Sequence, residues 1–406
     1  MENSSPFPHL DVLYVIGKDG SKELRPRIVF LMAFACAISV ANLYWVQPLL
    51  DTIAHDFGAS TTTAGLSVTF TQFGYVLGLV FIVPLGDLLE RKRLIISISI
   101  LTTIALIVAA VSPTIHFFLG ALMLVGLASV VVQILVPFAA TLAGDHERGK
   151  VVGQVMGGLL LGILFARTLS GFIADLAGWR AVFGSAAVLM LIVTLVLAKS
   201  LPRYKHNLSL SYHRLLLSVL DLIRKERSLR IRSIYGGLVF ANFGVFWTSI
   251  TFLLAGPPFH YSDALIGLFG LVGAAGALSA TIAGRLTDRG FAGTTTIIFV
   301  LLNLISFLLM LPGSNAVVFI IVGDVLLDAG VQGTHITNQS IIYRLSPEAR
   351  SRITTAYMTA YFIGGTIGSA LSAALYPSYG WTGVCFLGIV FSVLAVGLWV
   401  YEKFIL

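Results

Sequence analysis

Long apolar runs separated by short polar stretches dominate the chain. They occupy 28–50, 63–86, 94–112, 116–143, 151–175 and 181–199, and then 233–255, 264–284, 294–312, 316–343, 353–376 and 381–402. About 20 residues of helix cross the ~30 Å hydrocarbon core of a bilayer, and backbone polar groups in lipid must bond within their own segment. The pattern predicts an all-α membrane protein with twelve transmembrane helices.

The order of the runs, six and then six, predicts two pseudo-symmetric six-helix bundles. The expected parts are an N-terminal tail (1–27), a first bundle (28–199), a basic linker (200–232) and a second bundle (233–406). Gly178-Trp179 recurs as Gly380-Trp381, roughly 200 residues later, which favours a duplicated unit. Parallel six-helix repeats are a transporter architecture whose substrate site lies between the repeats near the midplane.

The basic residues set the expected orientation. If the chain crosses the bilayer at every run, all of them except Arg167 and Arg180 fall on one side. Lys and Arg in short loops favour the cytoplasm, so both termini and the linker are expected there, in a plasma or inner membrane. The net charge of +7 then lies beside lipid headgroups rather than on a nucleic-acid surface.

Other features narrow the function further. Charged residues make up 11% of the chain, against about 25% in a soluble domain. Cys36 and Cys385 lie inside apolar runs, which suggests core thiols rather than a disulfide or a metal site. No GxxxxGK[ST] motif for ATP is present. We expect no cofactor, no metal, no catalytic residues and a monomer that acts on a small molecule.

Several segments resemble the major facilitator superfamily, over 28–402. GDLLERKR (86–93) is similar to its signature loop after the second helix. NLYWVQPLL (42–50), LLGILFARTLSG (160–171) and GWRAVF (178–183) resemble its twelve-helix efflux branch, near drug:proton antiporters and sugar or arabinose efflux permeases. The resemblance implies two bundles that rock around a central site, and it implies that helices 1, 4, 7 and 10 line the passage.

The resemblance also implies a gating role for the polar loops. The candidate gating residues are Gly86, Asp87, Glu90, Arg91 and Arg93, with Asp288 and Arg289 in the related AGRLTDRG segment. The first loop lacks the family's second glycine, so either of its acids could fill the family's acidic position. The alternative is that these charges only fix the topology.

The run 316–343 carries one polar stripe. Its members are Asp324, Asp328, Gln332, His335, Asn338 and Gln339, which fall within about 120° of the helix surface. Lipid cannot face such a stripe, so it must face protein or water. Asp324, Asp328 and His335 are candidates for proton coupling, because two nearby acids away from water resist both being charged. The alternative is a structural network.

Arg167 is a further candidate for proton coupling. It follows a row of small residues, Gly158, Gly162 and Ala166, that allows close helix packing. A cation at this depth needs a carboxylate, carbonyls or water, and an aspartate of the stripe is one possible partner. The alternative is that its side chain snorkels to the outer surface.

Weaker candidates for the substrate cavity are spread over other runs. They are Asn42, Tyr44, Gln47, Gln72, Gln133, Asn242 and Trp247, together with Gln332, Asn338 and Gln339. Amides and aromatics suit a neutral or amphipathic organic solute, although each could instead serve packing. The sequence predicts proton-coupled export of a sugar or drug-like compound. An importer or uniporter is the alternative, and a membrane-embedded enzyme or a sensor is the alternative of another class.

Overall fold

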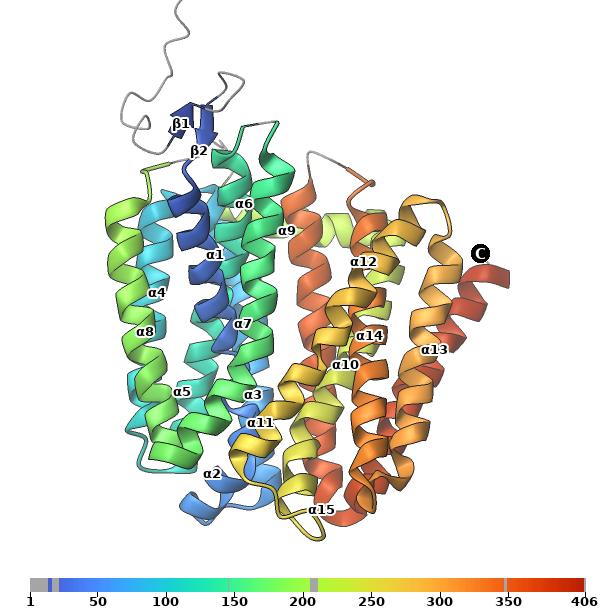
Figure 1. Ribbon diagram of the computed structural model, residues 1–406. Coiled ribbons are helices and arrows are strands. Elements are labelled where there is room, and N and C mark those ends of the chain that lie inside the picture. Colours follow the sequence, from blue (N-terminus) through green and yellow to red (C-terminus); the bar gives the residue numbers. More distant parts are fainter. Residues whose placement is uncertain (1–13, 17–21, 145, 205–210, 347–348, 405–406) are drawn as a thin grey trace, which may run out of the picture.

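The computed structural model describes the whole chain except residues 1–13, 17–21, 145, 205–210, 347–348 and 405–406. The described part is almost entirely helical (Figure 1). Within it, nine helical stretches are long and apolar enough to cross a membrane. Three further crossings are the first, the eighth and the last. The first and the eighth are each divided into shorter helices, and the last is the second part of the final helix. The predicted twelve-span helical fold is confirmed.

The first half of the molecule contains helices α1 to α8. They are α1 (Pro26–Ala41), η2 (Gln47–Leu49), α2 (Leu50–Phe57), α3 (Thr61–Phe81), η3 (Val83–Asp87), α4 (Arg91–Ala110), α5 (Ile115–Ala128), η4 (Ser129–Val131), α6 (Val132–Leu142), α7 (Arg148–Ala177) and α8 (Trp179–Ser200). Side chains with a hydroxyl group cap the N-termini of α3 and α5. The Ser60 hydroxyl, for example, accepts the backbone N–H of Thr63. The first and fourth crossings, expected as single runs, are each interrupted.

The second half contains helices α10 to α15. They are α10 (Arg227–Ala255), α11 (Asp263–Val272), α12 (Ala274–Asp288), α13 (Ala292–Met310), η5 (Leu311–Ser314), α14 (Val317–Ile342) and α15 (Arg350–Phe404). α15 holds two crossings, separated at Gly380, whose φ is 55°. Gly178 separates α7 from α8 with a φ of 83°. Both positions need a residue without Cβ, which explains why this landmark recurs.

The two ends of the bundle differ in charge. The described N-terminal strands, the C-terminal end of α15 and the helix α9 (Tyr212–Lys225) lie at the upper end in Figure 1, here called the basic face. The Tyr212 hydroxyl donates to the Phe81 carbonyl at the end of α3 (2.8 Å), which fixes the linker to the first half. α2 lies at the other end, here called the opposite face.

Arg180, one of two cations outside the charge pattern, lies at the opposite face. Its guanidinium forms an ion pair with Asp56 of α2, and the Trp179 indole donates to the same carboxylate at 3.1 Å. The hydrogen bond from Arg180, followed by that from Trp179, lowers the pKa of Asp56. The exception to the charge pattern therefore has a local acidic partner.

Two short segments of the N-terminal tail form strands. β1 (Tyr14–Ile16) and β2 (Lys22–Leu24) form an antiparallel pair. The Tyr14 hydroxyl donates to the Leu142 carbonyl (3.0 Å), and the Leu24 N–H donates to Glu147 (2.7 Å). These bonds hold the strands on the first half, which a polar composition alone could not reveal.

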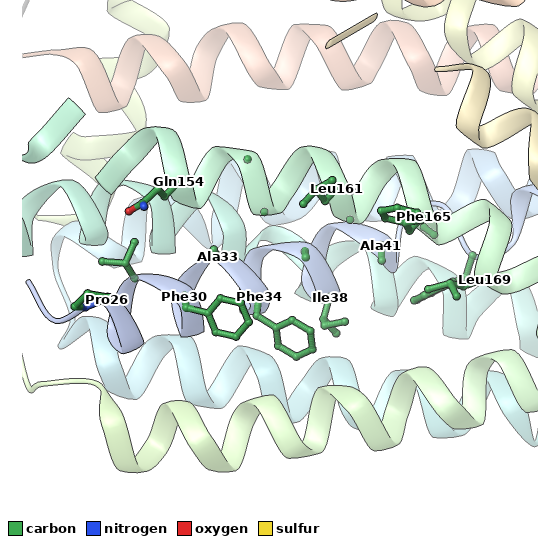
Figure 2. Close-up of a pocket in the computed structure, with 17 residues that line it drawn as sticks. Pro26, Phe30, Ala33, Phe34, Ile38, Ala41, Gln154, Leu161, Phe165 and Leu169 are labelled. Atoms are coloured by element: carbon green, nitrogen blue, oxygen red, sulfur yellow. The ribbon is translucent and has the colours of Figure 1, made fainter. Parts of the chain in front are cut away.

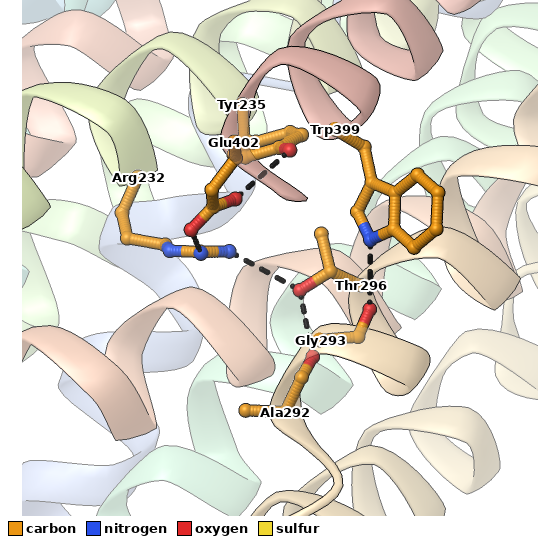
Figure 3. A network of polar contacts seen from close by, with 7 residues as sticks. All are labelled: Arg232, Tyr235, Ala292, Gly293, Thr296, Trp399 and Glu402. Carbon is orange, nitrogen blue, oxygen red and sulfur yellow. Dashed lines mark hydrogen bonds and ion pairs between the residues drawn. The ribbon is translucent and has the colours of Figure 1, made fainter. Parts of the chain in front are cut away.

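A buried ion pair holds the second half together near the basic face (Figure 3). Arg232 of α10 pairs with Glu402 of α15, donates to the Thr296 hydroxyl at 3.2 Å and is almost fully buried. Glu402 also accepts the Tyr235 hydroxyl at 3.1 Å. The indole of Trp399, one turn earlier on α15, donates to the Gly293 carbonyl (3.0 Å).

Replacing Glu402 with alanine should destabilise this half. The change leaves the Arg232 cation buried without its acid, which costs about 3 kcal/mol. We expect a lower midpoint of thermal unfolding in detergent. Glu226→Ala is the matched control, because no ion pair of Glu226 is formed among the described residues. Equal midpoints for the two variants would contradict the assigned role.

Candidate functional site

The site is centred on Arg167, which α7 places where the two halves meet. On one side of α7, Gly158 and Gly162 lie against α1, where an added Cβ would come within 2.4 and 2.3 Å of carbonyl oxygens. On the other side, glycines of α11 allow equally close contact. A Cβ at Gly267 would lie 2.5 Å from the Arg167 carbonyl oxygen. α7 is therefore clamped between α1 and α11.

The Arg167 guanidinium lies among aromatic rings. Its Cζ is 3.6 Å from the ring centroid of Trp247, 4.8 Å from that of Tyr44 and 5.2 Å from that of Phe243. Its Nε donates to Oε1 of Gln47 at 2.6 Å, and the side chain is 1% exposed. Arg167 therefore does not snorkel to the surface. Such desolvated cation–π contacts contribute ~2 kcal/mol each.

Two acids of α14 lie within electrostatic range of Arg167. Asp324 is 0% and Asp328 is 6% exposed. Neither forms a salt bridge or hydrogen bond with Arg167 among the described residues, and both oxygens of Asp324 lack a partner there. Nη2 of Arg167, Nε2 of Gln47 and Nε1 of Trp247 are also without partners in the described part. The cluster holds charged groups whose bonding is incomplete.

The breaks in the helices lie next to these groups. The first crossing is interrupted between Ala41 and Gln47, at Tyr44, and the eighth is interrupted at Gly273. A Cβ at Gly273 would come within 2.4 Å of Oδ2 of Asp328, so the lack of a side chain at this position leaves room for the carboxylate. Interrupted helices in transporters commonly border their ion and substrate sites.

Replacing Gly273 with alanine should displace the Asp328 carboxylate. A shift of ~1 Å in a positioned group can cost tenfold or more in rate. We expect transport to fall by that amount while the folded protein is retained. Gly184→Ala in α8 is the matched control, because no atom lies within 4 Å of an added Cβ there. Unchanged transport in Gly273→Ala would show that the carboxylate position is not needed.

The rest of the α14 stripe extends toward the basic face. Gln332, His335 and Gln339 are half-buried, whereas the two acids nearer the opposite face are buried. Nδ1 of His335 lies 3.0 Å from the Tyr357 hydroxyl, and Asn338 donates to the same hydroxyl at 3.4 Å. α15 thus supplies a polar partner to α14. Accessibility alternates along this part of the stripe, since Asn338 is fully buried.

The other cavity candidates lie in different surroundings. Gln72 of α3 faces Gly365 of α15, and its Oε1 has no partner in the described part. Gln133 donates to the Tyr75 hydroxyl at 3.0 Å, within the first half. Asn242 donates to the Ser392 hydroxyl at 2.8 Å, within the second half.

Asn42 has a local role in packing. Its Oδ1 accepts the Trp45 indole N–H at 3.0 Å, and the Trp45 side chain is 4% exposed. This tryptophan is therefore buried in the protein. Among the described residues, no group of three or more His, Cys, Asp and Glu side chains could hold a metal ion.

Polar contacts join the two halves at the opposite face. The Thr52 hydroxyl contacts both carboxylate oxygens of Asp263 (2.9 and 2.7 Å). Thr251 donates to the Gln47 carbonyl at 2.7 Å. The Thr69 hydroxyl lies 2.9 Å from the hydroxyl of Ser369, which also accepts the Thr248 hydroxyl at 2.9 Å from within the second half. The sequence interpretation missed Thr52 and Asp263, since Asp263 follows Ser262 and has the pattern of an ordinary first-turn acid.

The signature loop lies at the basic face. Arg91 is nearly buried and contacts Asp87 (3.7 Å), the Gly86 carbonyl (3.3 Å) and the Thr141 hydroxyl (3.0 Å). It also lies over the ring of Tyr204, from the linker. The other predicted gating residues lie nearer the surface. Glu90 forms an ion pair with Arg93 (3.1 Å), and Asp288 forms one with Arg344 (3.1 Å). Arg289 is exposed.

The fold and the site define a membrane transporter built from two helical halves. A sequence model of the Major Facilitator Superfamily matches residues 29–333 and 236–403. The chain belongs to this superfamily.

Known relatives and solved structures agree with this assignment. The chain is 49% identical to a putative uncharacterized transporter, YgaY, of Escherichia coli K12, over 93% of this chain and 96% of that protein. It is 33% identical to a probable transporter, SCO4007, of Streptomyces coelicolor, over 91% and 86%.

Two solved structures share the fold. A bacterial homologue of the human lysosomal transporter Spinster, in an inward-facing, unoccupied conformation, has a TM-score of 0.74 at 13% identity, covering 92% of this chain and 96% of that one. The E. coli xylose transporter XylE, partially occluded and inward open, has a TM-score of 0.70 at 14% identity, covering 93% and 97%. At such identities the likeness concerns the fold alone.

Proposed function

We propose that the protein is a proton-coupled secondary transporter that exports a small organic solute, such as a sugar or drug-like compound. It works as a monomer in the plasma or inner membrane, with the basic face and both termini in the cytoplasm. The observation that carries the proposal is the cluster of Arg167, Asp324 and Asp328, because its cation comes from the first half and its acids come from the second.

Charge in this cluster links the two halves. Arg167 attracts the aspartates and lies on Trp247, so both interactions favour closure at the opposite face. A proton on an aspartate removes its negative charge and weakens this attraction. The Arg167 cation then lies without its acid in a region of low dielectric, which is energetically costly. Protonation therefore favours separation of the halves at the opposite face, which is the coupling that alternating access requires.

The basic face contributes the second gate. Arg91 holds Asp87, the Gly86 carbonyl and Tyr204 in one network, so the loop and the linker move together. The export direction rests on the resemblance to efflux proteins. An importer on the same scaffold would use the same cluster with the solute moving the other way.

Transport in reconstituted vesicles tests the proposal. A panel of sugars and drug-like compounds is first screened for thermal stabilisation of the purified protein. Solutes that stabilise it are then followed in everted vesicles with an imposed pH gradient. We expect solute accumulation that depends on the gradient. An unchanged rate after the gradient is collapsed would refute proton coupling, and accumulation of the opposite sign would indicate import.

A further inference from the structure

An apolar groove of about 690 Å³ runs along the outer surface of the first half (Figure 2). α1 contributes Phe30, Phe34 and Ile38, and α7 contributes Leu161, Phe165 and Leu169. Phe30 is 72% and Leu161 is 54% exposed. In a membrane-spanning chain, exposed side chains of this kind face lipid, so the groove opens into the bilayer.

The groove is closed toward the interior of the molecule. Its floor is the contact between Gly158 and Gly162 of α7 and Ala33 and Ala37 of α1. An added Cβ on either glycine would come within 2.4 Å of a carbonyl oxygen of α1, so no side chain fits between the helices. The groove is therefore separate from the cluster around Arg167 and is not a path for solute to reach it.

Exposed cations lie at the end of the groove at the basic face. Pro26 and Gln154 line that end. Arg27 follows Pro26 and shares a helix face with Phe30 and Phe34, and Lys150 lies one turn before Gln154. Both cations are exposed, and neither forms an ion pair with a described acid.

The described acids near this end are at least partly buried, and one of them is hydrogen-bonded. Glu147 is buried and accepts the Leu24 N–H at 2.7 Å, and Glu23 of β2 is half-buried. Arg25 donates to the Tyr14 carbonyl at 3.2 Å and adds a further exposed cation beside Pro26. Among the described residues at the groove entrance, exposed cations therefore outnumber exposed acids.

The groove is long enough to hold an acyl chain across one leaflet. α1 spans 16 residues, or about 24 Å at 1.5 Å per residue, whereas one leaflet contributes ~15 Å of hydrocarbon. A chain that enters at the cationic end can therefore lie in the groove over the full depth of its leaflet.

We propose that this groove binds one anionic phospholipid, with its phosphate group at Arg27 and Lys150 and an acyl chain along Phe30, Phe34 and Leu161. Basic sites between spanning helices recognise anionic headgroups, and each buried CH₂ of the chain adds to the affinity. The proposal does not depend on the solute or on proton coupling.

Native mass spectrometry of the purified full chain tests the site, with dioleoyl phosphatidylglycerol and dioleoyl phosphatidylcholine as probes. We expect one phosphatidylglycerol molecule to remain bound under collision conditions that remove phosphatidylcholine. Gly157→Leu places a side chain in the groove, where no atom lies within 4 Å of an added Cβ, and should abolish this retention. Gly153→Leu, equally unobstructed on the same helix but outside the groove, should retain it.

A second variant separates the headgroup from the chain. Arg27→Gln combined with Lys150→Gln should reduce the preference for phosphatidylglycerol about tenfold, while Lys225→Gln, another exposed cation at the basic face, should not. Unfolding midpoints show that each variant is folded. Equal retention of the two lipids by the parent protein, or undiminished retention by folded Gly157→Leu, would overturn the proposal.

Discussion

Replacing Arg167 with glutamine should open the protein at the opposite face and abolish coupled transport. The guanidinium belongs to the first half and makes two kinds of interaction with the second half. It stacks on the Trp247 ring in a cation–π contact, and it attracts the acids of α14. Loss of a desolvated cation–π contact alone costs ~2 kcal/mol, which corresponds to roughly a thirtyfold shift between two states.

A cysteine reporter measures this shift without knowledge of the solute. Ser369 is fully buried where the halves meet at the opposite face, and Ser369→Cys would be labelled by an impermeant maleimide only when the halves separate there. Cys36 and Cys385 are buried and give little background. We expect at least tenfold faster labelling in Arg167→Gln. Arg180→Gln, whose ion pair with Asp56 is exposed, is the matched control.

A double-mutant cycle identifies the partner of Arg167. Asp328→Asn, which imitates the protonated acid, should also accelerate labelling. The two changes together should have less effect than the sum of their separate free energies, because each removes one end of the same attraction. Additive effects would refute the link between Arg167 and Asp328, and Asp324→Asn in the same cycle shows which acid carries more of it.

The sequence was most informative where charged residues lie within membrane-spanning runs. Asp324, Asp328 and Arg167 stand out because charge in an apolar run is costly, and the structure places them in one electrostatic cluster. The stripe on α14 followed from periodicity alone. The aromatic rings around Arg167 could not be predicted in the same way. Tyr44 and Trp247 come from other crossings, and their own runs mark them only as weak cavity candidates.

Interruptions of the helices were harder to predict. The break at Gly273 lies in a long, mostly apolar run, and the group that this glycine approaches, the Asp328 carboxylate, belongs to a different helix. The contacts of Asp263 and Thr52 were missed for the same reason, since each residue has an ordinary local pattern and acquires its role only across the interface. Local sequence predicts helices well, but the side chains that join two halves depend on long-range packing.

A second prediction separates steric from electrostatic control of the same gate. Gly171 of α7 lies so close to α11 that an added Cβ would come within 2.1 Å of the Asp263 carbonyl oxygen. Backbone atoms cannot give way as a flexible side chain can, so Gly171→Ala must push α7 and α11 apart, at a cost of ~1–3 kcal/mol. We expect faster labelling of Ser369→Cys and loss of transport. Gly184→Ala in α8 is the unobstructed control.

The two variants should differ in their response to charge. Gly171→Ala acts by overlap of atoms, so adding Asp328→Asn should accelerate labelling by the same factor as in the parent protein. In Arg167→Gln the same addition should have little further effect, since the attraction is already lost. If Gly171→Ala left labelling unchanged, the contact between α7 and α11 would not limit opening. If it instead removed the response to Asp328→Asn, the packing of these helices and the charge cluster would act as one unit.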